Sequence, residues 1–280
     1  MSGSPVDQRY LAGIHAVVTG GSKGIGAAIA RALFARGASV TLMSRNAAAL
    51  EVAAHSLLLN TDEQVLRLAQ DDRERQPQVR TVVCDVADEA SVASAFATAA
   101  RELGPVGILV NNAGIAESAL FGETTRALWD RLLAVNLTGT FLCAQQVLPA
   151  MLKARSGRII NIASTAGLKG YKTMTAYCAA KHGVVGFTRA LALETAKHGV
   201  TVNAVCPGYT DTELTDSAVA NIVAALGKTP NEARAMLVKL IPRGALTSPA
   251  EVAAAVSWLC APESAAITGI ALPVAGGEFG

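Results

Sequence analysis

Short apolar runs rich in β-branched residues recur along the chain and predict the strands of a sheet. They are apolar at consecutive positions, which is typical of strands buried on both faces of a parallel sheet. An antiparallel sheet with one solvated face would show alternation instead. The predicted strands are His15–Thr19, Ser39–Met43, Thr81–Cys84, Gly107–Val110, Arg158–Ile162, Thr201–Val205 and Ala271–Val274.

Longer segments with helical periodicity separate these runs. They are Ile25–Ala35, Ser91–Leu103, Thr124–Lys153, Ala176–Ala196 and Pro249–Leu259. Alternation of strand and helix predicts a parallel sheet with right-handed crossovers and helices on both faces. Since no linker or internal repeat divides the chain, we expect one doubly wound α/β domain over residues 11–280, after a flexible N-terminus at residues 1–10.

Two segments depart from this alternation. Leu57–Val79 carries clusters of acidic and basic residues around a few leucines, which predicts an exposed helical insertion with a solvated surface. Thr210–Ile241 follows the sixth predicted strand and is rich in small and helix-forming residues. Because open α/β sheets place ligand-covering elements at the carboxyl ends of strands, we expect the second segment to be a substrate lid.

Composition narrows the class of protein. A chain of 280 residues with 51% hydrophobic and 16% charged residues is typical of a globular protein with a large core. The net charge of +2, without a dense run of Lys and Arg, argues against nucleic-acid binding. We find no uncharged apolar stretch of transmembrane length, and Met1–Tyr10 lacks the apolar core of a secretory signal, so we expect a cytoplasmic protein away from membranes.

Cysteine and histidine give no indication of a metal site. The five cysteines are widely spaced and form no Cys-x-x-Cys pair, which favours buried free thiols in a reducing compartment. The four histidines show no metal-binding spacing. We therefore predict no metal.

A glycine-rich loop, Thr19-Gly-Gly-Ser-Lys-Gly24-Ile-Gly26, lies between the first predicted strand and the helix after it. In that setting Gly20 permits a tight turn, Gly24 lets the backbone approach a pyrophosphate, and Gly26 lets the helix pack on the strand. The helix N-terminus offers free N–H groups to the phosphates. The loop predicts a dinucleotide site, the alternative being a turn that merely needs glycine.

The end of the second strand indicates which dinucleotide binds. Ser44-Arg45-Asn46 stands where an acidic residue would bind a free ribose 2′-hydroxyl. Arg45 can bind a 2′-phosphate instead, and Lys23 can add a second positive charge. We expect NADP(H) to be favoured, with NAD(H) possible; the alternative for Arg45 is a solvated side chain after a strand.

A tyrosine and a lysine four residues apart, Tyr177 and Lys181, share one face of a predicted helix, and Ser164 lies thirteen residues upstream. Tyrosine has an ordinary pKa near 10 and needs a nearby cation to act as an acid or base near neutrality. Lys181 is placed to be that cation. A lone tyrosine on an apolar helix is more often a core residue, but the glycine loop in the same chain favours chemistry.

Together these motifs resemble the short-chain dehydrogenase/reductase family, from Leu11 to Gly277. Asn111-Asn112-Ala113-Gly114 is similar to the family turn that lines the cofactor cleft, and Pro207-Gly208 to the turn after strand six. Asp85 resembles the aspartate at the adenine ring, and Thr212 the threonine at the carboxamide. The motifs and the resemblance imply the following cofactor-binding positions: Gly20, Ser22, Lys23, Gly24, Ile25, Gly26, Ser44, Arg45, Asp85, Val86, Asn112, Ala113, Gly114, Tyr177, Lys181, Pro207, Gly208, Thr210 and Thr212.

The resemblance also implies a catalytic tetrad of Asn136, Ser164, Tyr177 and Lys181. Tyr177 would be the general acid in ketone reduction and the general base in alcohol oxidation, with Lys181 lowering its pKa and holding the nicotinamide ribose. Ser164 would hydrogen-bond the substrate oxygen. Asn136 would relay protons through its carbonyl and a water; the alternative is a buried asparagine that bridges a strand and a helix.

A seven-stranded doubly wound sheet and a homotetramer are implied as well, with Thr124–Lys153 and Ala176–Ala196 at the interfaces. Both helices carry apolar residues on more than one face, which agrees weakly with this expectation.

The substrate is less well indicated. The expected pocket residues are small or apolar: Ala116, Ser164, Ala166, Tyr171, Met174, Tyr177, Tyr209 and Leu214. Ala176–Leu193 resembles hydroxybutyrate dehydrogenases, but Ala166 stands where that subgroup has a carboxylate-binding histidine, and its glutamine near Ala116 is absent too. Hydroxybutyrate is therefore disfavoured.

Val135–Glu251 is also similar to bacterial β-ketoacyl and aromatic polyketide ketoreductases. Our leading hypothesis is reduction of a 3-oxoacyl thioester or another bulky apolar ketone. Lys153, Arg155 and Arg158 would then face an acidic carrier protein or form a solvated basic turn. The alternatives are NAD-dependent oxidation of a hydrophobic secondary alcohol and a sensor that binds dinucleotide without catalysis.

Overall fold

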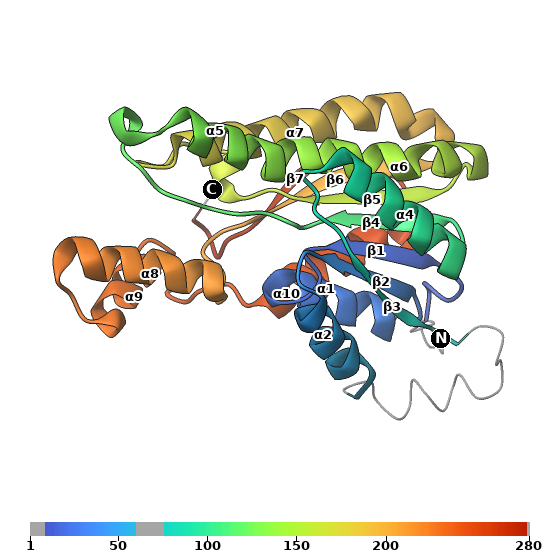
Figure 1. The fold of residues 1–280 in the computed structure, drawn as a ribbon, viewed down its shortest axis with the longest axis horizontal. Helices are drawn as coiled ribbons and strands as arrows, with labels where there is room; N and C mark the ends of the chain where they lie inside the picture. Colours follow the sequence, from blue (N-terminus) through green and yellow to red (C-terminus); the bar gives the residue numbers. More distant parts are fainter. Residues whose placement is uncertain (1–8, 60–75, 279–280) are drawn as a thin grey trace, which may run out of the picture.

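Seven parallel strands form one sheet in the order β3-β2-β1-β4-β5-β6-β7. The computed structural model describes residues 9–59 and 76–278. All seven predicted strands are present, and the doubly wound parallel sheet is confirmed (Figure 1). The strands are β1 (His15–Thr19), β2 (Ser39–Ser44), β3 (Val79–Val83), β4 (Val106–Asn111), β5 (Gly157–Ile162), β6 (Val200–Pro207) and β7 (Ala271–Val274).

Helices cover both faces of the sheet (Figure 1). One face carries α1 (Gly24–Ala35), α2 (Ala47–Leu59) and α10 (Pro249–Cys260). The other carries α4 (Glu89–Leu103), α5 (Arg126–Leu133), α6 (Gly139–Ala154) and α7 (Thr175–Thr195). Val17 and Val18 of β1 are fully buried and belong to different apolar clusters, one on each face, which is why this strand is apolar at consecutive positions.

A buried polar ladder fixes the register of β4 with β5. Asn111 and Asn161 are paired across the two strands. The Asn111 side-chain amide donates to Asn161 Oδ1 at 2.9 Å, and the Asn161 amide donates to Thr188 Oγ1 of α7 at 2.8 Å. Because buried polar groups need partners, a slip in register would leave these amides unpaired. The ladder therefore holds the carboxyl ends of β4 and β5 level with α7.

Two helical features differ from the prediction. The sequence analysis did not predict α2, and Leu57–Leu59 close this helix instead of opening an insertion. The rest of the expected Leu57–Val79 insertion lies largely outside the described residues, which resume at Gln76. The predicted helix Thr124–Lys153 is α5 and α6 joined by a π-helical turn at Ala134–Thr138.

This joined run, Arg126–Ala154, is 29 residues long and apolar enough to cross a membrane by length and composition alone. The sequence analysis found no such stretch. In the structure Leu142, Val147 and Met151 of α6 are buried in the apolar cluster that also contains Leu109 of β4 and Ile159 of β5. The run thus has the setting of a core helix.

The predicted lid segment forms two helices, α8 (Glu213–Leu226) and α9 (Pro230–Val238), which project beyond the end of the sheet (Figure 1). Val219, Ala233 and Leu237 pack between them. Thr229 and Glu232 form a reciprocal capping box that begins α9. The two helices therefore have a small apolar core of their own.

Candidate active site

The glycine loop follows β1 and adopts a conformation that only glycine fits. Gly20 has φ +62°, and a Cβ there would lie 2.8 Å from Asn112 Nδ2. A Cβ on Gly26 would lie 2.2 Å from the carbonyl oxygen of Gly20. Asn112 locks the turn, because its side-chain amide donates to the carbonyls of Thr19 at 2.9 Å and Gly20 at 3.1 Å. The ends of β1 and β4 are thereby tied together.

The start of α1 has the chemistry of a phosphate site. Lys23 is the N-cap residue, and within the described chain no side chain caps the helix. The first-turn N–H groups are therefore available to an anion, with the helix dipole in their favour. This cradle fits the pyrophosphate of a dinucleotide, with Ser22 and Ile25 beside Gly24, whose φ is +53°.

The two cations expected at the 2′-phosphate, Arg45 and Lys23, lie in different environments. Arg45 is exposed just after β2, where it can reach a ligand. Ser44 and Asn46 shape the turn around it, and Asn46 Oδ1 accepts a hydrogen bond from Ala49 N at 3.0 Å at the start of α2. Lys23 is ion-paired with Glu213, the first residue of α8. The expected second cation is thus engaged by the lid segment.

The remaining cofactor positions lie at the carboxyl ends of other strands. Asp85 follows β3, and its Oδ1 accepts from Ala87 N at 3.0 Å. Val86 is buried beside Gly139.

Thr210 and Thr212 follow Pro207 and Gly208 of the β6 turn. Thr212 Cγ2 would lie 3.4 Å from a Cβ on Gly24. The residues between β6 and α8 therefore contact the glycine loop. Ala113 N donates to Thr19 Oγ1 at 3.1 Å.

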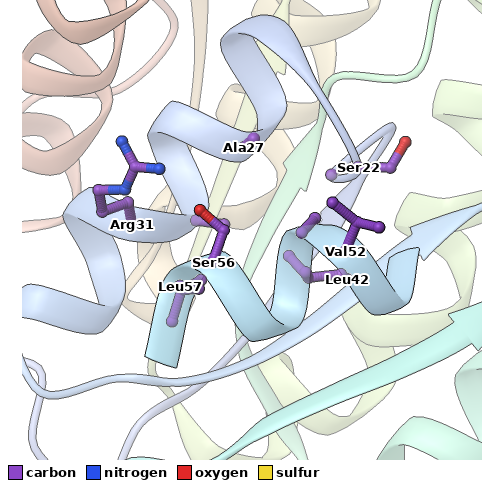
Figure 2. Close-up of a pocket in the computed structure, with 10 residues that line it drawn as sticks. Ser22, Ala27, Arg31, Leu42, Val52, Ser56 and Leu57 are labelled. Atoms are coloured by element: carbon purple, nitrogen blue, oxygen red, sulfur yellow. The ribbon is translucent and has the colours of Figure 1, made fainter. Parts of the chain in front are cut away.

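Figure 2 shows a small pocket between α1 and α2, lined by residues that include Ser22, Arg31 and Ser56. Its volume is about 160 Å³. Ligand pockets measure roughly 300–1,000 Å³, so this space is too small for a dinucleotide. It lies beside the glycine loop, and neither Ser164 after β5 nor Tyr177 of α7 lines it.

Ser164, Tyr177 and Lys181 are brought together as predicted. Ser164 follows β5, and Tyr177 and Lys181 lie in the first two turns of α7. Lys181 Nζ is 5.7 Å from the centre of the Tyr177 ring and donates to the carbonyl oxygen of Ile162 at 2.8 Å. Both side chains are buried, at 9% and 4% exposure. Gly114 lies next to this ammonium and leaves room for Asn136, since a Cβ there would lie 3.6 Å from Nζ but only 2.8 Å from Asn136 Oδ1.

Burial dominates the electrostatics of this pair. It raises the pKa of Tyr177 to about 12, and a hydrogen bond with Ser164 opposes this shift. Burial lowers the pKa of Lys181 to about 8. The sequence analysis expected a lowered tyrosine pKa; the pKa is raised instead, because desolvation disfavours the phenolate more than its surroundings favour it. Tyr177 is a neutral phenol at neutral pH, the form that can donate a proton.

Asn136 lies in the π-helical turn and is fully buried. Its side-chain amide donates to the carbonyls of Ile115 and Leu132, each at 3.0 Å, and Oδ1 accepts from Ile115 N at 3.2 Å. Its main-chain carbonyl accepts from Thr140 Oγ1 at 3.0 Å. These contacts fit the bridging role weighed in the sequence analysis, whereas the proton relay stays a prediction.

The expected substrate residues fall into two groups. Ala166 and Tyr177 share an apolar cluster with Ala116, Tyr171 and Met174, together with Leu128 and Trp129 of α5, which sequence reasoning missed. Tyr209 packs instead against the apolar core of the lid helices, and Leu214 on α8 is 49% exposed. The structure therefore places a fixed apolar wall beside Tyr177 and a second wall on the lid.

Lys153, Arg155 and Arg158 lie at the wrong edge of the sheet to present a substrate carrier. Arg155 donates to the carbonyl of Lys197 at 2.7 Å, just before β5 begins at Gly157. Ser164 follows the opposite end of this strand. Because six extended residues span about 20 Å, the basic turn is remote from Tyr177. The solvated-turn alternative fits Lys153 and Arg155, which are exposed, but not Arg158, which lies in β5 and has a buried Nε.

Glu278 is the residue of this region that sequence reasoning missed most clearly. It follows β7 at the same sheet edge as Ser164, and its side chain is 3% exposed. The Tyr171 hydroxyl donates to Glu278 Oε1. Its position after the last parallel strand was the available signal, because ligands bind at the carboxyl ends of strands. Its burial could not be predicted, because it depends on how segments far apart in the sequence pack together.

Comparisons with known proteins agree with this geometry. The family model of short chain dehydrogenases matches residues 14–222. Ketoacyl reductase 1 of the granaticin polyketide synthase from Streptomyces violaceoruber is 41% identical over 267 residues, covering 94% of this chain and 92% of that protein. The 3-oxoacyl-(acyl-carrier-protein) reductase of Vibrio harveyi is 39% identical over 271 residues, covering 96% and 98%.

A solved structure of an actinorhodin polyketide ketoreductase variant with NADPH superposes with a TM-score of 0.86 at 37% identity, covering 95% of this chain and 97% of that one. Family model, relatives and solved structure all extend over the glycine loop and over Ser164, Tyr177 and Lys181. This chain belongs to the short-chain dehydrogenase/reductase family of oxidoreductases.

Proposed function

We propose that the protein is an NADP(H)-dependent reductase of a 3-oxoacyl thioester or another bulky apolar ketone. The observation that carries the proposal is the buried Tyr177, set beside Lys181 in the first two turns of α7, at the same sheet edge as Ser164 and the dinucleotide cradle. The similarity to the 3-oxoacyl-(acyl-carrier-protein) reductase of Vibrio harveyi supports the substrate, and the similarity to the actinorhodin ketoreductase structure with NADPH supports the cofactor.

The proposed reaction assigns one task to each side chain. When bound, NADPH supplies a hydride to the carbonyl carbon. Tyr177 donates its phenolic proton to the carbonyl oxygen as negative charge develops there, and Ser164 donates a hydrogen bond to the same oxygen. The Lys181 ammonium stabilises the phenolate that this transfer leaves behind. The wall of Ala116, Ala166 and Met174 binds the apolar part of the ketone.

The proposal is tested by following NADPH absorbance with acetoacetyl-coenzyme A and a bicyclic ketone as probes. Tyr177→Phe should lower kcat at least 100-fold while NADPH binding, measured by fluorescence, stays within about threefold, because positioned acid catalysis contributes roughly 10²–10⁴-fold. Tyr10→Phe is the matched control, since the Tyr10 hydroxyl contacts Ser257 away from the site. A Tyr177→Phe variant with more than a tenth of wild-type kcat would refute the assignment.

A second candidate is oxidation of a hydrophobic secondary alcohol. One observation favours it: a cis-4-hydroxycyclohexanecarboxylate dehydrogenase of Sinomonas cyclohexanicum is 40% identical over 263 residues. The two functions differ in cofactor and direction. A higher kcat/KM for NADH than for NADPH, with faster alcohol oxidation than ketone reduction at neutral pH, would select the second.

A further inference from the structure

Glu278 places an unpaired carboxylate oxygen at the edge of the proposed substrate site. Oε1 accepts from the Tyr171 hydroxyl and lies 3.5 Å from Lys169 Nζ, which also donates to the main-chain carbonyl of Glu278 at 3.0 Å. Oε2 is buried and, among the residues that the structure describes, has no hydrogen-bond partner. Carboxylate oxygens are acceptors, so Oε2 is a free acceptor.

A short hydrogen-bond chain connects this carboxylate with the catalytic loop. The Tyr171 hydroxyl lies 2.7 Å from Thr165 Oγ1 and also contacts Glu278 Oε1. Because a phenol carries one proton and a carboxylate only accepts, Thr165 donates to Tyr171 and Tyr171 donates to Glu278. Thr165 follows Ser164 directly, so Glu278 lies two hydrogen bonds from the residue that neighbours the proposed oxygen-binding serine.

The free oxygen lies between the two walls described above. A Cβ on Gly208 would be 2.6 Å from Oε2, which places this atom against the β6 turn. Tyr171 belongs to the apolar cluster of Tyr177. Tyr209, on the lid side, has a pKa raised by burial and then by the charge of Glu278. The carboxylate thus lies next to the β6 turn and Tyr171, and Oε2 is its one oxygen without a partner in the described residues.

A buried carboxylate discriminates between ligands by charge and by hydrogen-bonding capacity. It is stabilised by a hydroxyl that donates a hydrogen bond to it. It stays without a partner beside a hydrocarbon group, and it repels a second carboxylate. Lys169 neutralises part of its charge, but it does so at Oε1 and at the main-chain carbonyl. Oε2 retains its acceptor capacity toward the β6 turn.

We propose that Glu278 is a specificity-determining residue whose Oε2 accepts a hydrogen bond from a substrate hydroxyl remote from the ketone. The enzyme then prefers hydroxylated ketones to carboxylated ones of the same shape. This inference rests on the proposed ketone reduction and adds the substrate class to it.

The test uses three bicyclic ketones of one skeleton: 2-tetralone, 6-hydroxy-2-tetralone and 6-carboxy-2-tetralone. For the wild-type protein we expect kcat/KM to be highest for the hydroxyl compound and lowest for the carboxylate. Glu278→Leu should lower the ratio of hydroxyl to unsubstituted kcat/KM about 10-fold or more, as expected for loss of a hydrogen bond to a charged group. Glu278→Gln should raise kcat/KM for the carboxylate relative to 2-tetralone, because it removes the repelling charge.

Glu263→Gln, an exposed carboxylate change, is the control and should leave all three ratios as in the wild type. Glu278→Gln is nearly isosteric, so it keeps the test decisive where Glu278→Leu fails to fold. If Glu278→Gln reduces 2-tetralone and has the same kcat/KM ratios among the three ketones as the wild type, the proposed role of Glu278 is overturned. The proposed function is not affected by that result. Failure of the wild type to reduce any of the three ketones, or acetoacetyl-coenzyme A, overturns the proposed function instead.

Discussion

At the scale of single residues, burial shifts the pKa values of the proposed catalytic pair. Tyr177 and Lys181 are both enclosed by apolar side chains and the ends of β4 and β5, and their pKa values shift in opposite directions for the same reason. The reaction thereby begins from a neutral phenol. The ammonium beside it is held by the carbonyl of Ile162, so it is in place before the phenol loses its proton.

The lowered pKa of Lys181 predicts a pH dependence of stability. The folded lysine titrates near pH 8, whereas the unfolded one titrates near 10.5. Between these values the unfolded chain holds a proton that the folded chain has lost, so the free energy of unfolding rises with pH. Burial of the charge is fully unfavourable below pH 8 and is relieved toward pH 10.5.

Lys181→Met should therefore stabilise the protein most at pH 7 relative to the wild type. This relative gain should shrink by on the order of 3 kcal/mol as the pH approaches 10.5. Urea unfolding at pH 7, 8, 9 and 10 measures it. Lys197→Met, on an exposed lysine, should run parallel to the wild type. If the free energy of unfolding changes with pH in the same way for Lys181→Met and the wild type, the buried lysine does not titrate between pH 7 and 10.

We expect Arg45 to carry the cofactor preference at the residue scale. Its side chain is exposed after β2, while Lys23 is already paired with Glu213. Arg45→Ala should raise KM for NADPH about 10-fold or more, as expected for loss of a charge-assisted hydrogen bond, and leave KM for NADH within about twofold. Arg101→Ala on the remote helix α4 is the control. Equal effects on both cofactors would remove Arg45 from the 2′-phosphate site.

At the scale of elements, the π-helical turn between α5 and α6 is the most consequential local irregularity. A π-turn inserts one extra residue into a helix and often marks a functional site. Here it turns Asn136 inward, where its amide binds the backbone after β4. The turn couples the long helix to the segment that follows Gly114, next to Lys181.

Asn136→Ala should destabilise the protein by about 3 kcal/mol, because it leaves the buried N–H and carbonyl of Ile115 without their partner. The measurement is urea unfolding at pH 7. Asn221→Ala, on the lid helix α8, is a matched control and should change the free energy of unfolding by less than about 0.5 kcal/mol. A stability equal to the wild type would mean that other groups satisfy the backbone after β4.

The ion pairs of Arg234 lead to a prediction about the role of the lid in binding the ketone. This α9 side chain is ion-paired with Asp211 and Asp216, at the beginning of α8. Since the pairs are at the surface, Arg234→Ala should change global stability by less than about 1 kcal/mol. We expect it to raise KM for the ketone several-fold with a smaller effect on kcat, because the lid wall is less ordered. Arg80→Ala, which breaks a surface pair between β3 and α4, should leave KM unchanged.

The individual helices and strands also show which parts of the fold could be predicted from the sequence. Strands such as β1 and β5 are buried on both faces, so their composition alone identifies them. Helix α2 escaped prediction because Ala47–Leu59 is apolar around its circumference and shows little periodicity. Spacing on one helix predicted that Tyr177 and Lys181 lie together, while their expected chemistry also needed the glycine loop and the family resemblance. Glu278 could not be assigned in the same way, because it meets Tyr171 only after the whole sheet has formed.

At the scale of the whole molecule, the parallel sheet collects the functional groups at one edge. Residues after β1, β4, β5, β6 and β7 meet there because parallel strands share a direction. The opposite edge carries the basic turn of Arg155 and Arg158. Cofactor cradle, catalytic pair and lid are thereby supplied by segments far apart in sequence.

We propose a homotetramer with the outer faces of α6 and α7 at its interfaces. Phe141 of α6 and Leu193 of α7 are 42% and 83% exposed, and such apolar groups favour association. Light scattering should give the mass of four chains for the wild type, and Phe141→Glu should give a smaller particle. Thr98→Glu, on α4, is the control. A wild-type mass of one chain would contradict the proposal.

The ion pair between Lys23 and Glu213 joins the glycine loop to the first residue of α8. Its consequence is practical for protein engineering. A substitution of Lys23 chosen to change the cofactor also removes this surface contact with α8. We therefore expect Lys23 substitutions to affect both cofactor binding and the lid, and Arg45 substitutions to affect cofactor binding alone.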